Sequence, residues 1–222
     1  MKVRFSHLSV FTVMMLIISC TSPVKPLKNQ SIYSAAVTGN TRMLETLLAR
    51  GVDVNSRDQR RGWTALLFAT EAGHLPAVKL LMKNGANVNM GSIKDRFTPL
   101  MRAASNGYFD IVKYLVSNKV KLDVQDRRLQ STALMWAAFK GHDQIVDYLL
   151  ENKALIGVRG GRGESALWLA VSHANVKTVK VLLLAGANPN RVDWRGVSPY
   201  HLAVKKNKIE MIKLLSQFGG KK

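Results

Sequence analysis

The sequence contains a single cysteine, Cys20, among its 222 residues. One thiol cannot form an internal disulfide, so a folded domain in this chain must be stabilised by apolar packing. The spacings C-x-x-C and H-E-x-x-H, which are typical of zinc sites, are also absent. The sequence therefore excludes a disulfide scaffold and zinc sites of these two types.

The apolar run near the N-terminus is too short to span a membrane. Leu8–Ile18 has eleven residues, whereas a spanning helix needs about 20. The run follows the basic residues Lys2 and Arg4, which is typical of a secretory signal. It ends in I-I-S-C at 17–20, which resembles the lipobox of bacterial lipoproteins and implies that Cys20 is lipidated. The alternatives are an ordinary signal peptide that is cleaved nearby and an uncleaved anchor.

A short motif recurs at intervals of 34, 34, 33 and 33 residues. Each copy begins with a hydroxyl residue and continues with a mostly apolar tetrad; the five hydroxyl residues are Thr64, Thr98, Thr132, Ser165 and Ser198. A degenerate copy at 32–55 lies one interval before the first. A period of this length is typical of a solenoid that stacks supersecondary repeats.

Each repeat has the pattern of two short antiparallel helices. The hydroxyl residue can cap the first helix, and Pro99 and Pro199 occupy its first position, where a missing N–H costs nothing. A Gly or Asn nine residues after the hydroxyl residue ends this helix in four of the five copies, with Ala174 as the exception. The second helix has apolar residues at intervals of three and four. We therefore expect an all-α repeat solenoid of six helix-turn-helix repeats linked by hairpin-like finger loops.

These motifs resemble the ankyrin repeat, whose pattern includes T-P-L-H, G-H and G-A-x-V-N. The matches include T-P-L-M at 98–101, G-H at 73–74 and 141–142, G-A-N-V-N at 85–89 and G-A-N-P-N at 186–190. The resemblance implies a protein-binding module, and we expect no cofactor. Lys119 and Lys153 replace the usual Gly, and the first three loops between repeats have one extra residue. We expect longer or looser fingers at these places.

The chain is thereby divided into three parts. Residues 1–19 are predicted to be a lipoprotein signal peptide, residues 20–30 the lipidated cysteine and a tether, and residues 31–220 the repeat domain. The predicted repeats lie near 31–57, 58–91, 92–125, 126–158, 159–191 and 192–220. By resemblance to bacterial lipoproteins, we expect the mature protein in the periplasm, anchored by lipid. Thr21, which follows the cysteine, favours the outer membrane if the source is Gram-negative.

Acidic residues are scarce. The chain has 33 Lys and Arg against 14 Asp and Glu, and removal of the signal peptide takes away two basic residues and no acid, which leaves a net charge of +17. Eleven basic residues lie in the predicted fingers: Arg57, Arg60, Arg61, Lys94, Arg96, Arg127, Arg128, Arg159, Arg162, Arg191 and Arg195. The fingers contain five acids: Asp58, Asp95, Asp126, Glu164 and Asp193. We expect a basic ridge along the finger edge, suited to carboxylates or phosphates, although a basic surface can also serve solubility alone.

Ankyrin proteins bind partners with the finger tips and the exposed face of the first helix. Transfer of those positions gives the candidate partner-binding residues: Arg60, Arg61, Trp63, Lys94, Phe97, Arg128, Leu129, Phe139, Lys140, Arg162, His173, Trp194, Arg195, Lys205 and Lys206, with Glu71 and Asp95 beside them. Four of these are aromatic residues that we expect at the surface, because the repeat core does not require them. Trp136 and Trp168 are expected to pack between repeats.

The sequence contains no recognisable catalytic constellation. The repeat motifs account for His74, His142 and His201, which leaves His173. The glycine-rich segment 160–163 lacks the Lys-Ser/Thr and the strand of a phosphate-binding loop, so it predicts a flexible finger. We therefore expect a protein that is not an enzyme.

The leading functional hypothesis is a lipid-anchored monomer that binds an acidic protein outside the cytoplasm, and more specifically an immunity protein that neutralises a toxic effector. One alternative is a periplasmic factor for stress protection or assembly, for example in peroxide resistance. Another is a binder of anionic envelope lipids. Export argues against nucleic acid as the natural ligand.

Overall fold

The computed structural model describes residues 31–221, and all of its regular structure is helical. The twelve helices are α2 (Ile32–Val37), α3 (Thr41–Ala49), α4 (Ala65–Glu71), α5 (Leu75–Lys83), α6 (Pro99–Asn106), α7 (Phe109–Ser117), α8 (Ala133–Lys140), α9 (Asp143–Glu151), α10 (Ala166–Ser172), α11 (Val176–Leu184), α12 (Pro199–Lys205) and α13 (Ile209–Gln217). The predicted signal peptide, Cys20 and the tether lie outside the described residues. None of the described helices is long and apolar enough to cross a lipid bilayer.

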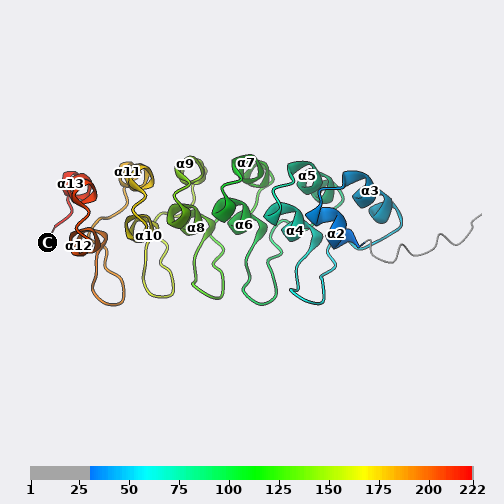
Figure 1. Cartoon of the computed structure of the whole chain (residues 1–222), viewed down its shortest axis with the longest axis horizontal. Helices are drawn as coiled ribbons and strands as arrows, with labels where there is room; N and C mark the ends of the chain where they lie inside the picture. The colour runs from blue at the N-terminus through cyan, green and yellow to red at the C-terminus, as the bar shows by residue number, and fades with distance from the viewer. Residues whose placement is uncertain (1–30, 222) are drawn as a thin grey trace, which may run out of the picture. The chain divides into compact units, whose positions relative to one another are not determined.

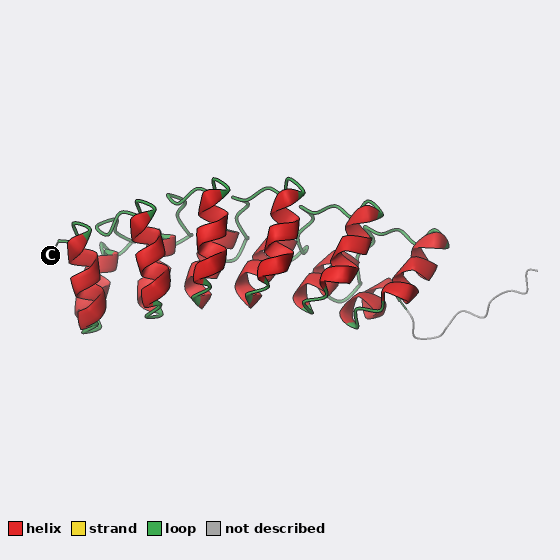
Figure 2. Ribbon diagram, turned by 90° about the horizontal axis from the view of Figure 1, so that it is seen from above, coloured by secondary structure: helices red, strands yellow, loops and turns green. Residues whose placement is uncertain are grey.

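The helices form six antiparallel pairs that stand in a row (Figure 1). The even-numbered inner helices make one layer and the odd-numbered outer helices make the other, as the view from above also shows (Figure 2). The loops between pairs project from the inner-helix side as fingers. Each helix packs against its neighbours in the same layer and its partner in the pair. The predicted all-α solenoid of six repeats is confirmed.

The predicted hydroxyl caps begin the inner helices. Thr64 Oγ1 accepts a hydrogen bond from the backbone N–H of Leu67 at 3.3 Å, and Ser165 Oγ accepts from Trp168 at 3.1 Å. The other three inner helices with a predicted cap start in the same way, and Ser31 caps α2. One of the orphan donors at each helix start is thereby satisfied.

The left-handed turns after the helices are kept even where glycine is missing. Ala174 follows α10 with φ 61°, and Lys119 and Lys153 follow the outer helices α7 and α9 with φ 57° and 71°. Gly85 occupies the corresponding position after α5 with φ 85°. The backbone therefore takes the same turn at the two lysines, at a cost in strain. The expectation of looser fingers at these places stays a prediction.

Five fingers can be defined by the backbone hydrogen bond of 2.8–3.1 Å that closes each loop. They are finger 1 (58–63), finger 2 (92–97), finger 3 (126–131), finger 4 (160–164) and finger 5 (193–197). The extra residue of the first three loops lies at the tip. In fingers 1 and 2 the tip is closed by an i to i+4 bond, for example from the Gly62 N–H to the Asp58 carbonyl, whereas the Gly163 N–H bonds the Gly160 carbonyl at i to i+3.

Hydrogen bonds also join successive fingers. The Arg127 N–H donates to the Asp95 carbonyl at 2.7 Å, and the Gly161 N–H donates to the Leu129 carbonyl at 2.8 Å. The Trp194 N–H of finger 5 donates to the Arg162 carbonyl of finger 4 at 2.9 Å. Finger 3 thus bonds both of its neighbours, and finger 4 bonds fingers 3 and 5 despite its glycines.

Candidate protein-binding surface

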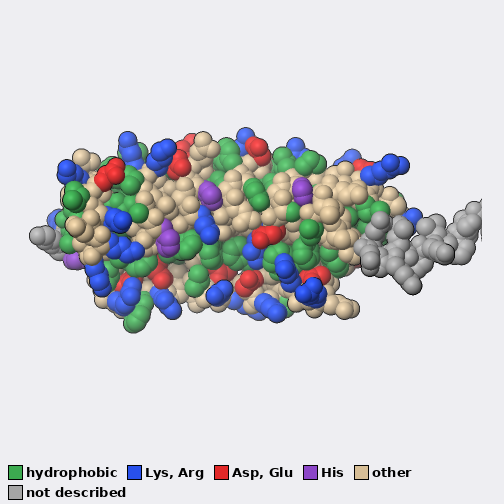
Figure 3. Space-filling model, viewed as in Figure 1, with side chains coloured by type: hydrophobic (Ala, Val, Ile, Leu, Met, Phe, Trp, Pro, Cys, Tyr) green, Lys and Arg blue, Asp and Glu red, His purple; other side chains and the backbone are tan. Residues whose placement is uncertain are grey.

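Most of the candidate residues lie on the finger edge or at the ends of inner helices. The exposed finger residues are Arg60, Arg61, Lys94, Arg128, Leu129, Arg162, Trp194 and Arg195. Lys140, His173, Lys205 and Lys206 are exposed at the ends of α8, α10 and α12. Figure 3 shows Lys and Arg side chains along the edge of the molecule at which the fingers project. Their role in binding a partner stays a prediction.

Two of the four candidate aromatics are buried, which corrects their expected exposure. Trp63 and Phe97 are 8% and 7% exposed, whereas Trp194 is 67% exposed. Each buried ring precedes the capping threonine of an inner helix, and both pack on the guanidinium of Arg102 from α6, at 4.5 and 4.3 Å from the ring centroids. The sequence does not reveal this burial, because Arg102 covers both rings from α6, which for Trp63 belongs to the next repeat.

The buried rings belong to a continuous aromatic strip along the inner-helix layer. The strip runs through Tyr33, Phe68, Trp63, Arg102, Phe97, Trp136, Phe139 and His173. Neighbouring rings have centroids 4.0–5.8 Å apart, and Arg102 joins the two halves. Tyr33, Phe68 and Arg102 are not among the candidate binding residues that the sequence suggests, because the contacts that connect them cross from one repeat to the next.

The half-buried members make the strip accessible to a partner. Tyr33, Phe68, Trp136 and Phe139 are partly exposed. Trp136 lies between Phe97 and Phe139 and donates from Nε1 to Asp126 Oδ2 at 3.1 Å. It thus packs on its neighbours as expected and also contributes to this surface. Aromatic rings that keep part of their area in water are typical anchors of protein interfaces.

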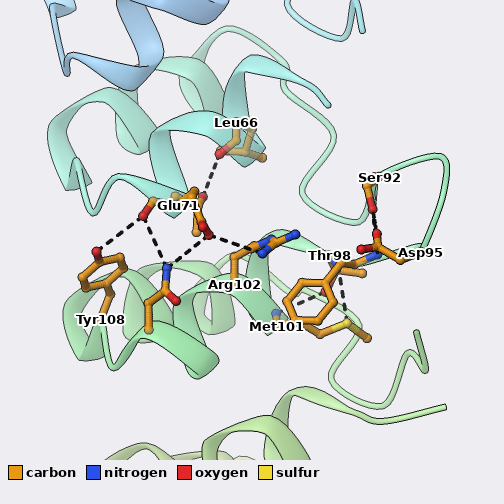
Figure 4. Close-up of polar contacts among 11 residues, drawn as sticks. Leu66, Glu71, Ser92, Asp95, Thr98, Met101, Arg102 and Tyr108 are labelled. Carbon is orange, nitrogen blue, oxygen red and sulfur yellow. Dashed lines mark hydrogen bonds and ion pairs between the residues drawn. The ribbon is translucent and has the colours of Figure 1, made fainter. Parts of the chain in front are cut away.

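Arg102 is held by an acid as well as by rings. Figure 4 shows Arg102 of α6 reaching Glu71 of α4, with Nη1 and Oε2 3.6 Å apart. Asn106 donates to the same carboxylate oxygen at 3.2 Å. Burial lowers the pKa of the Arg102 guanidinium, and the charges of Glu71 and Asp95 oppose this effect. Its Nε is buried with no hydrogen-bond partner within residues 31–221, so the rings and Glu71 fix the cation.

Several finger acids accept hydrogen bonds from backbone N–H groups of their own loops, and basic side chains outnumber acidic ones along the finger edge. Asp58 accepts hydrogen bonds from the N–H groups of Arg60, Arg61 and Trp63 at 2.6–3.2 Å. Burial raises the pKa of Asp58, but these N–H groups outweigh it and hold the pKa below its usual 3.8. Asp126 has the same role in finger 3. Among the described finger residues, Arg195 and Asp193 form the one ion pair, at 3.1 Å.

Not every finger arginine is available to a partner. Arg57 donates from Nη1 to the carbonyls of Gly62 and Gly91 at 2.6 and 2.9 Å. Arg159 donates to the Val192 carbonyl at 2.7 Å. These side chains connect a finger to the next, so part of the recurrent arginine bias is structural.

Three of the histidines make contacts within or between repeats. His74 and His142 contact the carbonyls of Val37 and Ser105 in the preceding repeat through Nε2 at 2.9 and 3.1 Å. His201 contacts the capping Ser198 at 2.8 Å. The described residues contain no group of three or more His, Cys, Asp and Glu side chains that could hold a metal ion.

Comparison with known proteins identifies the family. A family model described as ankyrin repeats in three copies matches residues 32–126, 92–160 and 134–222. The chain is similar to an ankyrin repeat domain from Acinetobacter baumannii AYE, with 30% identity, a TM-score of 0.78 and coverage of 86% of this chain and 98% of that one. It is also similar to the human ASB11 ankyrin repeat domain, with 29% identity, a TM-score of 0.76 and coverage of 86% and 85%.

A search of curated proteins gives no match to this chain. The likeness to solved structures extends to 617 chains, so it identifies a fold and a family but no partner. Ankyrin repeats indicate a protein–protein interaction module and are typically non-catalytic. The chain belongs to the ankyrin-repeat family.

Proposed function

We propose that this protein is a lipid-anchored module of the cell envelope that holds an acidic protein partner on its aromatic strip. The strip carries the proposal, because it runs along the inner helices from α2 to α8, has partly exposed rings on α2, α4 and α8, and lies beside basic fingers. Aromatic and arginine side chains supply most of the energy in protein interfaces. The exposed guanidinium groups would raise the rate of association with an acidic partner.

The proposed location depends on the N-terminal sequence. The short apolar run and the tetrad that ends at Cys20 support lipidation and export. Radiolabelled palmitate should mark the wild-type chain and fail to mark Cys20→Ser, and fractionation should find the wild type in the envelope. An unlabelled protein in the cytosolic fraction would contradict the anchor.

Neutralisation of a toxic effector is the specific role that we propose for the binding. It is supported by a long contact surface in a chain whose described residues have no catalytic arrangement, since an immunity protein needs contact and not chemistry. Deletion of the gene should matter when the effector is delivered, and growth without the effector should be unchanged. A growth defect under peroxide without any toxin would instead favour a stress-protection role.

Capture of the partner tests the binding surface directly. The tagged full chain, extracted from envelopes in mild detergent at about 0.15 M salt, should retain a stoichiometric acidic protein. Phe139→Ala should weaken this retention by about tenfold or more, because it removes a partly exposed ring of the strip between Trp136 and His173. Leu184→Ala, at a largely exposed leucine of the outer helix α11, is the control. Recovery of no protein partner would refute the proposal.

One further candidate has a specific observation behind it. The exposed guanidinium groups of fingers 1, 3 and 4 have no ion-pair partner among residues 31–221, which would also suit phosphate groups of anionic envelope lipids. Binding to such a polyanion should weaken steeply with salt. A protein interface with an aromatic centre should weaken much less, so a salt titration separates the two candidates.

A further inference from the structure

A pocket opens at the N-terminal end of the aromatic strip, between α2, finger 1 and α4. Its volume is about 570 Å³, which lies within the range of about 300–1,000 Å³ that is typical of ligand pockets. The rings of Tyr33, Trp63 and Phe68 line it, together with the aliphatic side chains of Val37 and Ala72. The pocket therefore offers an apolar wall formed by two adjacent repeats.

The apolar wall is already ordered before any partner arrives. The Phe68 ring packs on Tyr33 at 5.8 Å and on Trp63 at 5.1 Å between centroids. The Tyr33 hydroxyl donates to Ser56 Oγ at 3.1 Å, so its polar end is satisfied. The Trp63 ring is fixed from the other repeat by Arg102. An inserted side chain would meet a preorganised surface, which limits the entropy lost on binding.

The charges around the pocket are positive in balance. Both acids that line it have partners within the protein, since Asp58 accepts from finger amides and Glu71 pairs with Arg102. Arg60 and Arg61 also line it, and their side chains are exposed. The Arg61 guanidinium lies 5.0 Å from the centroid of the Trp63 ring. Since Glu71 pairs with Arg102, the two finger arginines outnumber the remaining acid, Asp58, by one, and they stand beside an apolar wall.

We propose that this pocket takes a phenylalanine, or a similarly large apolar side chain, from an acidic segment of the partner in which carboxylates flank that residue. The ring would pack on Tyr33, Phe68 and Val37, and the carboxylates would pair with the two arginines of finger 1. The inference rests on the proposed function and specifies its partner. Charge complementarity selects an acidic segment, and the aromatic wall selects its apolar residue.

A short peptide tests the pocket without knowledge of the partner. The probe is an acetylated, amidated pentapeptide with 4-fluorophenylalanine between two pairs of glutamates, titrated with the full chain in neutral detergent micelles and followed by fluorine NMR. Empty micelles provide the blank. We expect saturable broadening and a shift of the fluorine signal. Replacement of the glutamates by lysines should weaken binding by about tenfold or more. An unlabelled peptide with alanine at the centre should fail to compete.

Two pairs of variants test the two parts of the pocket. Val37→Trp fills the opening from a residue that is 46% exposed, and it should weaken binding by about tenfold. Val204→Trp, at a valine of α12 that is 39% exposed, should leave binding within about twofold. Arg60→Gln with Arg61→Gln should weaken binding by about tenfold, and Lys79→Gln with Lys83→Gln, on the outer helix of the same repeat, by about twofold at most.

The outcomes separate this inference from the proposed function. No saturable binding, equal binding of the glutamate and lysine peptides, or equal binding by Val37→Trp and the wild type would each overturn the pocket assignment. If the wild-type chain still captures a protein partner, and Phe139→Ala weakens that capture, the proposed function stays intact. A pocket that binds the peptide in a protein that captures no partner would refute the proposed function instead.

Discussion

Ala174 occupies a left-handed turn that glycine or asparagine occupies after all five of the other described inner helices. A Cβ in this conformation costs about 1 kcal/mol or more relative to glycine. Ala174→Gly should therefore raise the free energy of unfolding, measured in urea, by about 1 kcal/mol. Ala185→Gly is the matched control, because Ala185 ends α11 with φ −79° and gains nothing from glycine. Loss of stability in both variants would contradict the strain.

The burial of Trp63 predicts that its substitution lowers the stability of the fold. Because its ring is 8% exposed and packs between Phe68 and Arg102, Trp63→Ala should lower the free energy of unfolding by about 3 kcal/mol or more. Trp194→Ala should change it by about 0.5 kcal/mol at most, since that ring is 67% exposed. Urea denaturation of both variants measures the difference. Equal stability of the two variants would contradict the packing.

Asp193 links the stability of finger 5 to pH. Burial raises its pKa, but hydrogen bonds from the Val197 and Arg195 N–H groups and the Arg195 charge outweigh this and hold the pKa below its usual 3.8. Since the folded-state pKa is depressed, the stabilisation is fully present above the unfolded-state value and is lost as pH falls through the folded-state pKa. Asp193→Asn should therefore be less stable than the wild type at neutral pH, and the gap should shrink below pH 3.8. A gap that is constant over this range would contradict the assignment.

At the scale of the element, the helix boundaries were the most predictable feature. Thr64 and Ser165 mark the starts of α4 and α10, because a hydroxyl cap acts within three residues along the chain. The burial of Trp63 was not predictable in this way. It depends on Arg102 in the next repeat, and the same register position holds Ser131 in finger 3. Local signals thus give the elements, whereas the aromatic strip arises from contacts between repeats.

The outer helices, like the inner ones, contribute apolar contacts that join neighbouring repeats. Leu149 of α9 is fully buried in the core. Leu149→Ala should open a cavity and lower the free energy of unfolding by about 2–5 kcal/mol in urea. Leu184→Ala, on the exposed side of α11, should cost about 0.5 kcal/mol or less. If the two substitutions cost the same, α9 does not pack as described.

At the scale of the repeat domain, the inner-helix layer and the finger edge present different kinds of side chain. The inner-helix layer carries the aromatic strip, and the finger edge carries most of the exposed candidate arginines. The repetitive backbone brings the two together, since every finger ends where an inner helix begins. A partner that contacts both would gain apolar burial from the first and faster association from the second.

The repeat of α13 should open more readily than the repeat of α11, because within residues 31–221 α13 packs on a neighbouring outer helix on one side only. Its buried residues are Met211 and Leu215, whereas α11 buries Thr178, Val179, Leu182 and Leu183. In a solenoid, each repeat is stabilised by its neighbours, so a terminal repeat lacks one interface. Amide hydrogen exchange should therefore be faster in α13 than in α11 by about tenfold or more.

Substitution at one register position of two repeats tests this order of opening. Ile209 begins α13 and is exposed, whereas Val176 begins α11 and is partly buried against the core. Ile209→Glu should leave the free energy of unfolding within about 0.5 kcal/mol of the wild type. Val176→Glu should lower it by about 1–3 kcal/mol, because a charge is placed against the apolar core. Equal costs in urea, or slower exchange in α13 than in α11, would mean that the last repeat is covered by something other than solvent.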